Sequence, residues 1–182
     1  ILAVEPTPGL AETCRRKGIT ILEQTVESLD RQAISADFVA SFEVIEHLFS
    51  PYEYLRICRD LLKPGGLLLV TCPSCKGFDV MTLGAASTTY DAEHLNYFHP
   101  DSLSLLVKKC GFEVLETSTP GRLDADIVRS RVLKGELNLH EQPFLQHVLV
   151  TEWETKGQIF QDFLSNNNLS SHLWLLARHS TD

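Results

Sequence analysis

The sequence has no long hydrophobic run, since none of its apolar stretches approaches the roughly 20 residues that cross a membrane. Its first residues lack the basic region, the long apolar stretch and the cleavage site of a signal peptide. The five cysteines are an odd number at irregular positions, which favours reduced thiols over a disulfide framework. These absences predict a cytoplasmic protein without a membrane span.

The sequence is also short of positive charge. It has 16 Lys and Arg against 24 Asp and Glu, a formal net charge of -8. This balance argues against a broad electrostatic attraction to nucleic acid or to an anionic membrane, and it favours a small-molecule or protein substrate. With 43% hydrophobic residues and no repeat or obvious linker, residues 1–182 are expected to form one domain. The sequence leaves the oligomeric state open.

Short apolar runs alternate with helix signals along the first two thirds of the chain. Ser50-Pro51-Tyr52-Glu53 is a capping box, and prolines at positions 8 and 100 mark two further helix starts. Strands are expected at residues 1–4, 19–22, 37–42, 67–71 and 112–115. Strands that alternate with single helices imply right-handed crossovers, so the predicted fold class is α/β with a doubly wound, mainly parallel sheet.

The last third departs from this alternation. A break at Thr119-Pro120-Gly121-Arg122 is followed by an expected helical insertion at residues 123–168 and by an apolar strand at 171–178. We expect this strand to be an antiparallel edge strand beside the strand that begins at Phe112. The insertion would then leave the sheet at its ligand-binding end and cover the substrate.

Ligands of such sheets bind beyond the carboxyl ends of the strands, so the residues after each strand are candidates for binding. Glu5 follows the first strand, where a carboxylate can accept hydrogen bonds from both hydroxyls of an adenosine ribose. An alternative is that Glu5 offsets the positive end of the helix that begins nearby. Val26 and Glu27 follow the second strand and are candidates for flanking an adenine.

Two segments carry a specific resemblance. The run of residues 36–48, A-D-F-V-A-S-F-E-V-I-E-H-L, is followed by Leu62-Lys63-Pro64-Gly65-Gly66 before an apolar strand. In this order they resemble class I S-adenosylmethionine-dependent methyltransferases, whose fold is Rossmann-like. Glu93-His94-Leu95 and Gly111-Phe112 are similar to the branch of ubiquinone-biosynthesis O-methyltransferases. The resemblance covers residues 1–115.

The resemblance implies a cofactor, S-adenosylmethionine, and assigns residues to it. Glu5 would bind the ribose, Val26 and Glu27 would border the adenine, and Ser41 and Phe42 would line the methionine end. The first strand of the family and its Gly-x-Gly-x-Gly loop have no counterpart in this sequence. That strand normally lies between the second and fourth, so we expect a gap in the sheet and an N-terminally truncated domain.

The resemblance also implies a metal site. Glu43-x-x-Glu46-His47 is similar to the metal-binding cluster of some quinone O-methyltransferases, and a divalent cation such as magnesium would suit its carboxylates. The alternative is that Glu46 and His47 only order the turn after the strand.

Histidines provide the candidate catalytic groups, because imidazole titrates near neutral pH. His47 is a candidate general base, and His94 is a second candidate, with Tyr90 and Asp91 beside it for substrate contact. All but His47 lie in residues 76–98, which we interpret either as a lid or as an ordinary surface loop.

The predicted reaction is direct transfer of a methyl group to a small-molecule acceptor, with oxygen as the favoured acceptor atom. Alignment of the reactants would supply most of the catalysis. Two alternatives stay open: a non-catalytic remnant or accessory protein with this fold, and a nicotinamide-dependent oxidoreductase that shares Glu5. The sequence has no Tyr-x-x-x-Lys pair to support the oxidoreductase.

Overall fold

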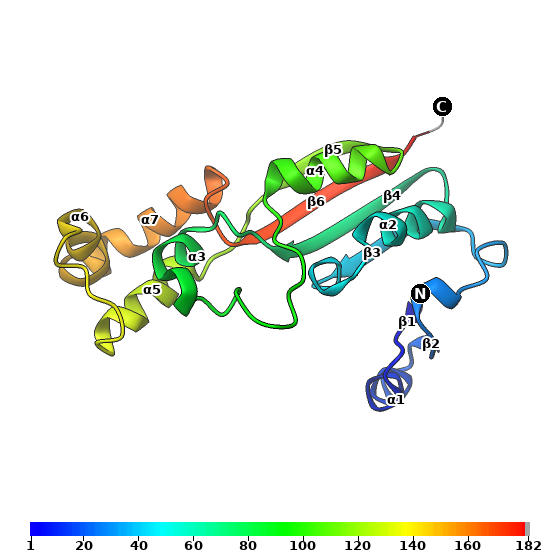
Figure 1. The fold of residues 1–182 in the computed structure, drawn as a ribbon, viewed down its shortest axis with the longest axis horizontal. Helices are drawn as coiled ribbons and strands as arrows, with labels where there is room; N and C mark the ends of the chain where they lie inside the picture. Colours follow the sequence, from blue (N-terminus) through cyan, green and yellow to red (C-terminus); the bar gives the residue numbers. More distant parts are fainter. Residues whose placement is uncertain (181–182) are drawn as a thin grey trace.

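Strands and helices alternate through most of the chain (Figure 1), and a computed structural model describes residues 1–180. The elements are β1 (Leu2–Val4), α1 (Pro8–Arg16), β2 (Thr20–Leu22), β3 (Ala36–Phe42), α2 (Pro51–Leu61), β4 (Leu62–Pro73), α3 (Phe78–Leu83), α4 (Pro100–Lys109), β5 (Phe112–Ser118), α5 (Asp124–Leu133), α6 (Pro143–Gln146), α7 (Trp153–Asn166) and β6 (His172–His179). Single turns of helix are η1 (Val26–Ser28), η2 (Ile45–His47), η3 (Gly84–Ala86) and the π-helical η4 (His147–Thr151).

The main sheet has four strands in the order β3-β4-β6-β5. Strands β3 and β4 are parallel, whereas β6 runs antiparallel to both β4 and β5. The α/β class and the antiparallel C-terminal strand are confirmed. The expected edge position of residues 171–178 is wrong, because β6 lies inside the sheet and β5 forms the edge. The connection through α4 passes over one strand position, and β6 fills that position with backbone partners on both sides.

Strands β1 and β2 form a separate parallel pair, with Ala3 opposite Ile21. Figure 1 shows this pair and α1 standing apart from the four-stranded sheet. Within residues 1–180, β1 pairs only with β2 and β3 pairs only with β4. The expected gap between these two strands is therefore present, and each of them keeps one edge without a partner strand.

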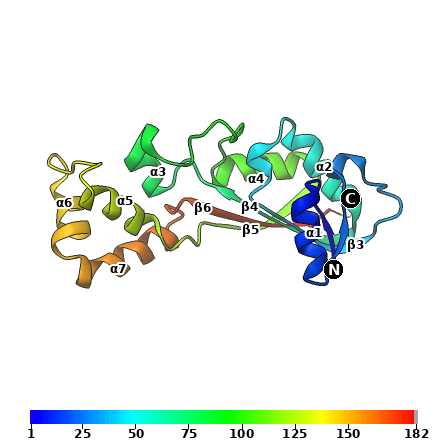
Figure 2. The same ribbon diagram turned by 90° about the horizontal axis from the view of Figure 1, so that it is seen from below.

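Helices α2 and α4 lie on the same side of the four strands (Figure 2). The predicted capping box is formed, because Ser50 Oγ accepts a hydrogen bond from the backbone N–H of Glu53 at 3.4 Å. The apolar faces of α2 and α4 bury a core with one face of the strands; its fully buried members include Leu55, Leu68, Leu103, Leu173 and Leu175. The opposite face leaves Phe38, Phe42 and Trp174 exposed.

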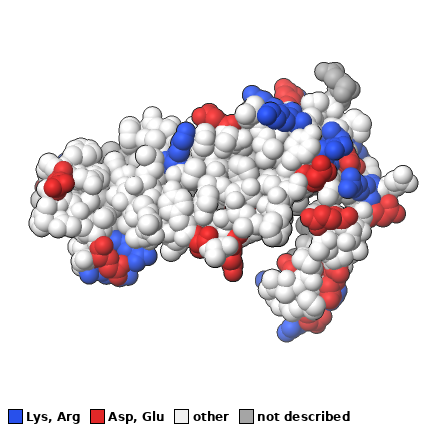
Figure 3. Space-filling model, viewed as in Figure 1, with Lys and Arg blue, Asp and Glu red and all other residues white. Residues whose placement is uncertain are grey.

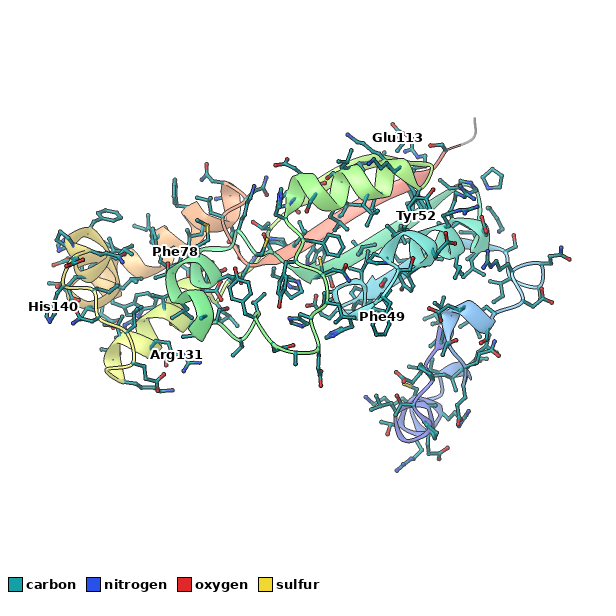
Figure 4. All side chains as sticks on the ribbon, viewed as in Figure 1. Phe49, Tyr52, Phe78, Glu113, Arg131 and His140 are labelled. Atoms are coloured by element: carbon teal, nitrogen blue, oxygen red, sulfur yellow. The ribbon has the colours of Figure 1, made fainter. Side chains whose placement is uncertain are left out.

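Four helical segments, α5, α6, η4 and α7, come between β5 and β6 along the chain. In space they extend beyond the carboxyl ends of β4 and β5 (Figure 1). They have their own apolar cluster around Val128, Leu149 and Leu164, against which Phe78 of α3 packs. Figure 4 shows Phe78 beside these helices. No helix within residues 1–180 is long and apolar enough to cross a membrane.

A buried polar joint fixes these helices to the sheet. The Asp124 carboxylate accepts hydrogen bonds from Ser170 Oγ at 2.6 Å, from the backbone N–H of Ser171 at 2.6 Å and from Gln161 Nε2 at 2.9 Å. These contacts tie the first turn of α5 to α7 and to the start of β6. The helical segments are therefore held firmly at the ligand-binding end of the sheet.

Candidate functional site

Glu43 is the first residue after β3, and its backbone has a left-handed conformation with φ of 50°. Such a conformation is uncommon for a residue other than glycine, and it often occurs at functional turns. The Glu43 carboxylate accepts a hydrogen bond from Thr71 Oγ1 at 2.7 Å and lies 3.7 Å from Nδ1 of His172. The turn therefore anchors the Glu43 side chain on the ends of β4 and β6.

Glu46, His47 and His94 form a compact cluster at the same edge of the sheet. One ligand atom from each residue lies within 4.8 Å of the other two. Glu46 is only 2% exposed, and neither carboxylate oxygen has a hydrogen-bond partner among the described residues. Burial raises the pKa of the Glu46 carboxyl above its ordinary value. An acid in this state is stabilised by a proton, by a cation or by a hydrogen-bond donor from a ligand.

The two imidazoles of the cluster are oriented by backbone carbonyls. Nδ1 of His47 lies 2.9 Å from the carbonyl oxygen of Glu93, and Nδ1 of His94 lies 2.7 Å from that of Thr89. Because a carbonyl only accepts hydrogen bonds, Nδ1 of each ring carries the proton, and Nε2 of the neutral ring keeps its lone pair. The ring centroids are 4.7 Å apart. Both histidines can therefore act as metal ligands or proton acceptors.

The segment that carries His94 is bound to the turn that carries Glu46. The backbone N–H groups of Leu95 and Asn96 donate to the carbonyl oxygen of Glu46 at 2.9 and 3.0 Å, and Asn96 Nδ2 donates to that of Leu48 at 2.7 Å. Residues 76–98 thus combine the helix α3, the turn η3 and a stretch that is hydrogen-bonded to η2. These contacts bring His94 to the cluster.

Tyr90 and Asp91 lie close to this cluster. Asp91 Oδ1 accepts hydrogen bonds from the backbone N–H groups of Glu93 and His94 at 2.7 and 3.0 Å, and these hydrogen bonds lower the pKa of Asp91. Tyr90 packs against Tyr97 with ring centroids 5.2 Å apart. Asp91 therefore shapes the turn before His94, and Tyr90 stays partly exposed beside it.

The structure groups the expected metal ligands differently from the sequence interpretation. Glu46 and His47 come together as expected, but Glu43 bonds to Thr71, and His94 completes the group of three. One carboxylate and two imidazoles suit a borderline ion such as zinc better than magnesium, which prefers oxygen ligands. The Glu-His-Leu motif singled out His94 in the sequence. The motif could not predict the contact with Glu46, because the two residues are far apart along the chain.

The residues expected to hold the adenosine part of the cofactor are divided between two places: Glu5 follows β1, whereas Val26 and Glu27 lie in η1, which packs beside α2. Glu5 Oε1 accepts a hydrogen bond from the backbone N–H of Thr7 at 2.8 Å, just before α1. This contact fixes the Glu5 side chain just ahead of the helix, and it engages only one carboxylate oxygen. Val26 packs on the core at the start of η1, and Glu27 beside it is exposed.

Ser41 and Phe42, expected at the methionine end of the cofactor, lie at the end of β3. Ser41 is 3% exposed, and its Oγ accepts a hydrogen bond from the hydroxyl of Tyr54 at 2.8 Å. Burial raises the pKa of Tyr54, so its phenol keeps the proton that it donates. Phe42 points to the exposed face of the sheet. Tyr54 thus connects α2 to the candidate site, although no motif in the sequence singled it out.

The fold and the position of these side chains define an α/β protein of the Rossmann-like methyltransferase class. A Thermotoga maritima protein described as a SAM-dependent methyltransferase superposes with a TM-score of 0.61 at 18% identity, covering 98% of this chain and 72% of its own. Phosphoethanolamine N-methyltransferase 2 of Haemonchus contortus, solved in complex with S-adenosyl-L-methionine, gives 0.56 at 15% identity, covering 100% and 43%. At these identities the likeness shows the fold.

The sequence identifies the family. Residues 4–117 match the family described as a methyltransferase domain, and the chain belongs to this family. The ubiquinone biosynthesis O-methyltransferase of Cereibacter sphaeroides is 32% identical over 112 residues, which are 56% of this chain and 44% of that protein. The same enzyme of Dinoroseobacter shibae is 33% identical over 101 residues, 50% and 40%. The chain thus spans less than half the length of these curated relatives.

Proposed function

We propose that this domain transfers a methyl group from S-adenosylmethionine to an oxygen atom of a small-molecule acceptor. The observation that carries the proposal is the cluster of Glu46, His47 and His94 at the carboxyl edge of the sheet, in a chain of the methyltransferase domain family. Two relatives that match this chain are named as O-methyltransferases, which supports oxygen as the acceptor atom. The nicotinamide alternative has no comparable support.

For cofactor binding, we propose that Glu5 accepts the ribose hydroxyls through the carboxylate oxygen that Thr7 leaves free. Val26 and Glu27 would border the adenine, and Ser41 and Phe42 would border the methionine end. Glu5 stands on the β1 side of the gap between β1 and β3, whereas Ser41 and Phe42 stand on the other side, together with Val26, which packs on the same core as Val39 of β3. A further strand that pairs with both free edges would bring the two groups of residues together, and we propose that such a strand completes the domain.

S-adenosylmethionine supplies a methyl group that is already activated, so the chain's own residues need only align the acceptor and manage one proton. We propose that His47 or His94 accepts the proton of the acceptor hydroxyl at Nε2. Their Nδ1–H groups donate to carbonyl oxygens, which holds each ring in the tautomer required for this role. Glu46 lies 3.9 Å from Nε2 of His47 and would stabilise the imidazolium that forms.

A divalent cation at Glu46, His47 and His94 is a second way to use this cluster. The buried, unpartnered carboxylate of Glu46 fits a cation, which would compensate its negative charge. A bound cation would lower the pKa of an acceptor hydroxyl that coordinates it. A histidine that binds a metal through Nε2 has no lone pair left for a proton, so the metal role and the base role exclude each other for each ring.

Isothermal titration calorimetry on the complete gene product tests the proposed function. We expect S-adenosylmethionine to bind, and NADH not to bind under the same conditions. Transfer of a labelled methyl group to catechol, a simple ring with two hydroxyls, then reports turnover. Binding of NADH in place of S-adenosylmethionine would contradict the proposal, whereas binding of neither would favour the non-catalytic alternative.

A further inference from the structure

A cavity of about 380 Å³ lies where the helical segments join the sheet. Residues 120–124 and 127, from the connection after β5 and the first turn of α5, form one wall, and residues 171–172 at the start of β6 form the other. The volume falls in the range of small-molecule sites. Because β5 ends and β6 starts at the carboxyl edge of the sheet, the cavity lies on the side where ligands of such sheets bind.

Arg122 is the cationic residue that lines this cavity. Its guanidinium forms no ion pair or hydrogen bond with any of residues 1–180, unlike Arg131, which pairs with Glu136 in the same group of helices. The chain as a whole carries a net charge of -8. Acidic and basic side chains both occur on the face of the molecule in Figure 3, and the unpaired guanidinium gives this cavity a local charge opposite in sign to the net charge. Its planar set of donors matches carboxylate and phosphate oxygens.

Asp124, the acidic residue of the cavity wall, does not neutralise Arg122. Its carboxylate is 2% exposed and accepts hydrogen bonds from Ser170, Ser171 and Gln161. Burial alone would raise the pKa of Asp124, but these hydrogen bonds outweigh burial and hold the pKa below its ordinary value. The negative charge of Asp124 is thus directed to internal donors, which leaves Arg122 available to a ligand.

His172 connects the cavity with the candidate site. His172 lines the cavity, and its imidazole lies 3.7 Å from the Glu43 carboxylate and packs edge-on against the ring of Trp174, with centroids 6.1 Å apart. Glu43 lies three residues before Glu46 in the sequence and two before the turn η2 that carries Glu46 and His47. A ligand held in the cavity would therefore extend toward the acid and histidine cluster.

We propose that this cavity binds an anionic oxygen group, carboxylate or phosphate, of the methyl acceptor and that Arg122 pairs with that group. The apolar side chains of Leu123 and Ile127 would then contact the body of the acceptor. This inference rests on the proposed function, because it names a chemical class for the acceptor. It assigns Arg122 a role in specificity and leaves the transfer itself to other residues.

The test is an NMR titration of the complete gene product with three single-ring probes, without S-adenosylmethionine. Benzoate and phenyl phosphate carry the two candidate anionic groups, and benzyl alcohol carries none. We expect one anion to bind at least about tenfold more tightly than benzyl alcohol, a difference of about 1.4 kcal/mol. The tighter of the two anions identifies the group. Shifts should centre on the backbone amides of residues 121–127 and 171–172.

The variant Arg122→Gln should weaken binding of that anion about tenfold and leave benzyl alcohol unchanged. Lys134→Gln removes the same charge at the far end of α5, so it serves as the matched control and should bind like the unmodified chain. Equal binding of all three probes, no binding at millimolar concentration, or an equal loss in both variants would overturn the proposal. S-adenosylmethionine takes no part in this titration, so failure of the proposed function is detected separately.

Discussion

The Glu46 carboxylate lies 3.9 Å from Nε2 of His47, and no described residue donates a hydrogen bond to it. A buried acid without a donor costs stability when it ionises, unless a cation or a ligand compensates its charge. The backbone carbonyl of Glu46 meanwhile holds the segment that brings His94 alongside. The turn therefore combines a firmly held backbone with an uncompensated side chain, which is typical of a binding site rather than of a structural turn.

The first prediction concerns the pH dependence of stability. The pKa of Glu46 is raised in the folded state, so its contribution to stability is complete below the ordinary pKa and is lost as pH rises through the folded value. Glu46→Gln removes this loss and should stabilise the metal-free protein by about 1–2 kcal/mol at pH 7. Urea unfolding at several pH values measures the effect. A variant less stable than the original protein at pH 7 would contradict this prediction.

The second prediction concerns the metal. Zinc should raise the thermal unfolding temperature of the protein, and His94→Ala should abolish the increase because it removes one of three ligands. Glu43→Gln is the informative comparison, since its carboxylate is bonded to Thr71 and should be dispensable for zinc. If Glu43→Gln loses the zinc effect while His94→Ala retains it, the ligands are those that the sequence spacing indicated. Magnesium in place of zinc tests the choice of ion.

Local signals in the sequence predicted the central elements well. The capping box at Ser50 begins α2, and the apolar run at residues 67–71 lies in β4, which starts earlier than expected, at Leu62, and includes the glycines at 65 and 66; both features depend on neighbouring residues alone. The inner position of β6 could not be predicted in this way, because strand order depends on which distant edges pair. An apolar run predicts only that a strand is buried. Inner strands and covered edge strands are both buried, so the run does not distinguish between them.

The candidate site was predictable only in part, for the same reason. Glu46 and His47 are adjacent in sequence, so their place in one turn was predictable. The position of His94 in the cluster depends on hydrogen bonds from Leu95 and Asn96 to that turn, which is far away in sequence. The orientation of Glu43 follows from its left-handed backbone and from Thr71 on the adjacent strand. Neither contact can be read from spacing along the chain.

The third prediction concerns Tyr54. Tyr54→Phe removes the hydroxyl that donates to Ser41 Oγ and leaves the ring packed, so the protein should lose about 1 kcal/mol of stability. Ser41→Ala should cost a similar amount, and the double variant should cost less than the sum because the two changes remove one hydrogen bond. Chemical denaturation of the four proteins gives the coupling energy. Additive losses would show that the hydrogen bond contributes nothing.

The fourth prediction concerns Glu5 in the complete gene product. Glu5→Ala should weaken binding of S-adenosylmethionine by about 1.5–3 kcal/mol, the range for hydrogen bonds to a charged group. Glu12→Ala removes the same charge from the middle of α1 and is the control. Since Glu5 also accepts from Thr7, unfolding must be measured alongside binding. Unchanged affinity in a folded Glu5→Ala protein would reduce Glu5 to a helix-end role.

The last prediction concerns the helical segments between β5 and β6. Replacing residues 123–168 by a short linker in the complete gene product should abolish methylation of the acceptor and leave binding of S-adenosylmethionine largely intact. The reason is topological: the residues proposed for the cofactor follow β1, β2 and β3, whereas these helices leave the sheet after β5 and form one wall of the cavity at Arg122.

Folding of the shortened protein must be established first, because the replacement removes Asp124 and its contacts with Ser170 and Ser171. Those two residues lie just before β6 and would gain water as a partner when the helices are removed, so the strand should keep its place between β4 and β5. Circular dichroism and an NMR spectrum with dispersed signals would establish this. Equal losses of cofactor binding and of methylation in such a folded protein would show that the helical segments do not act as a cap over the acceptor.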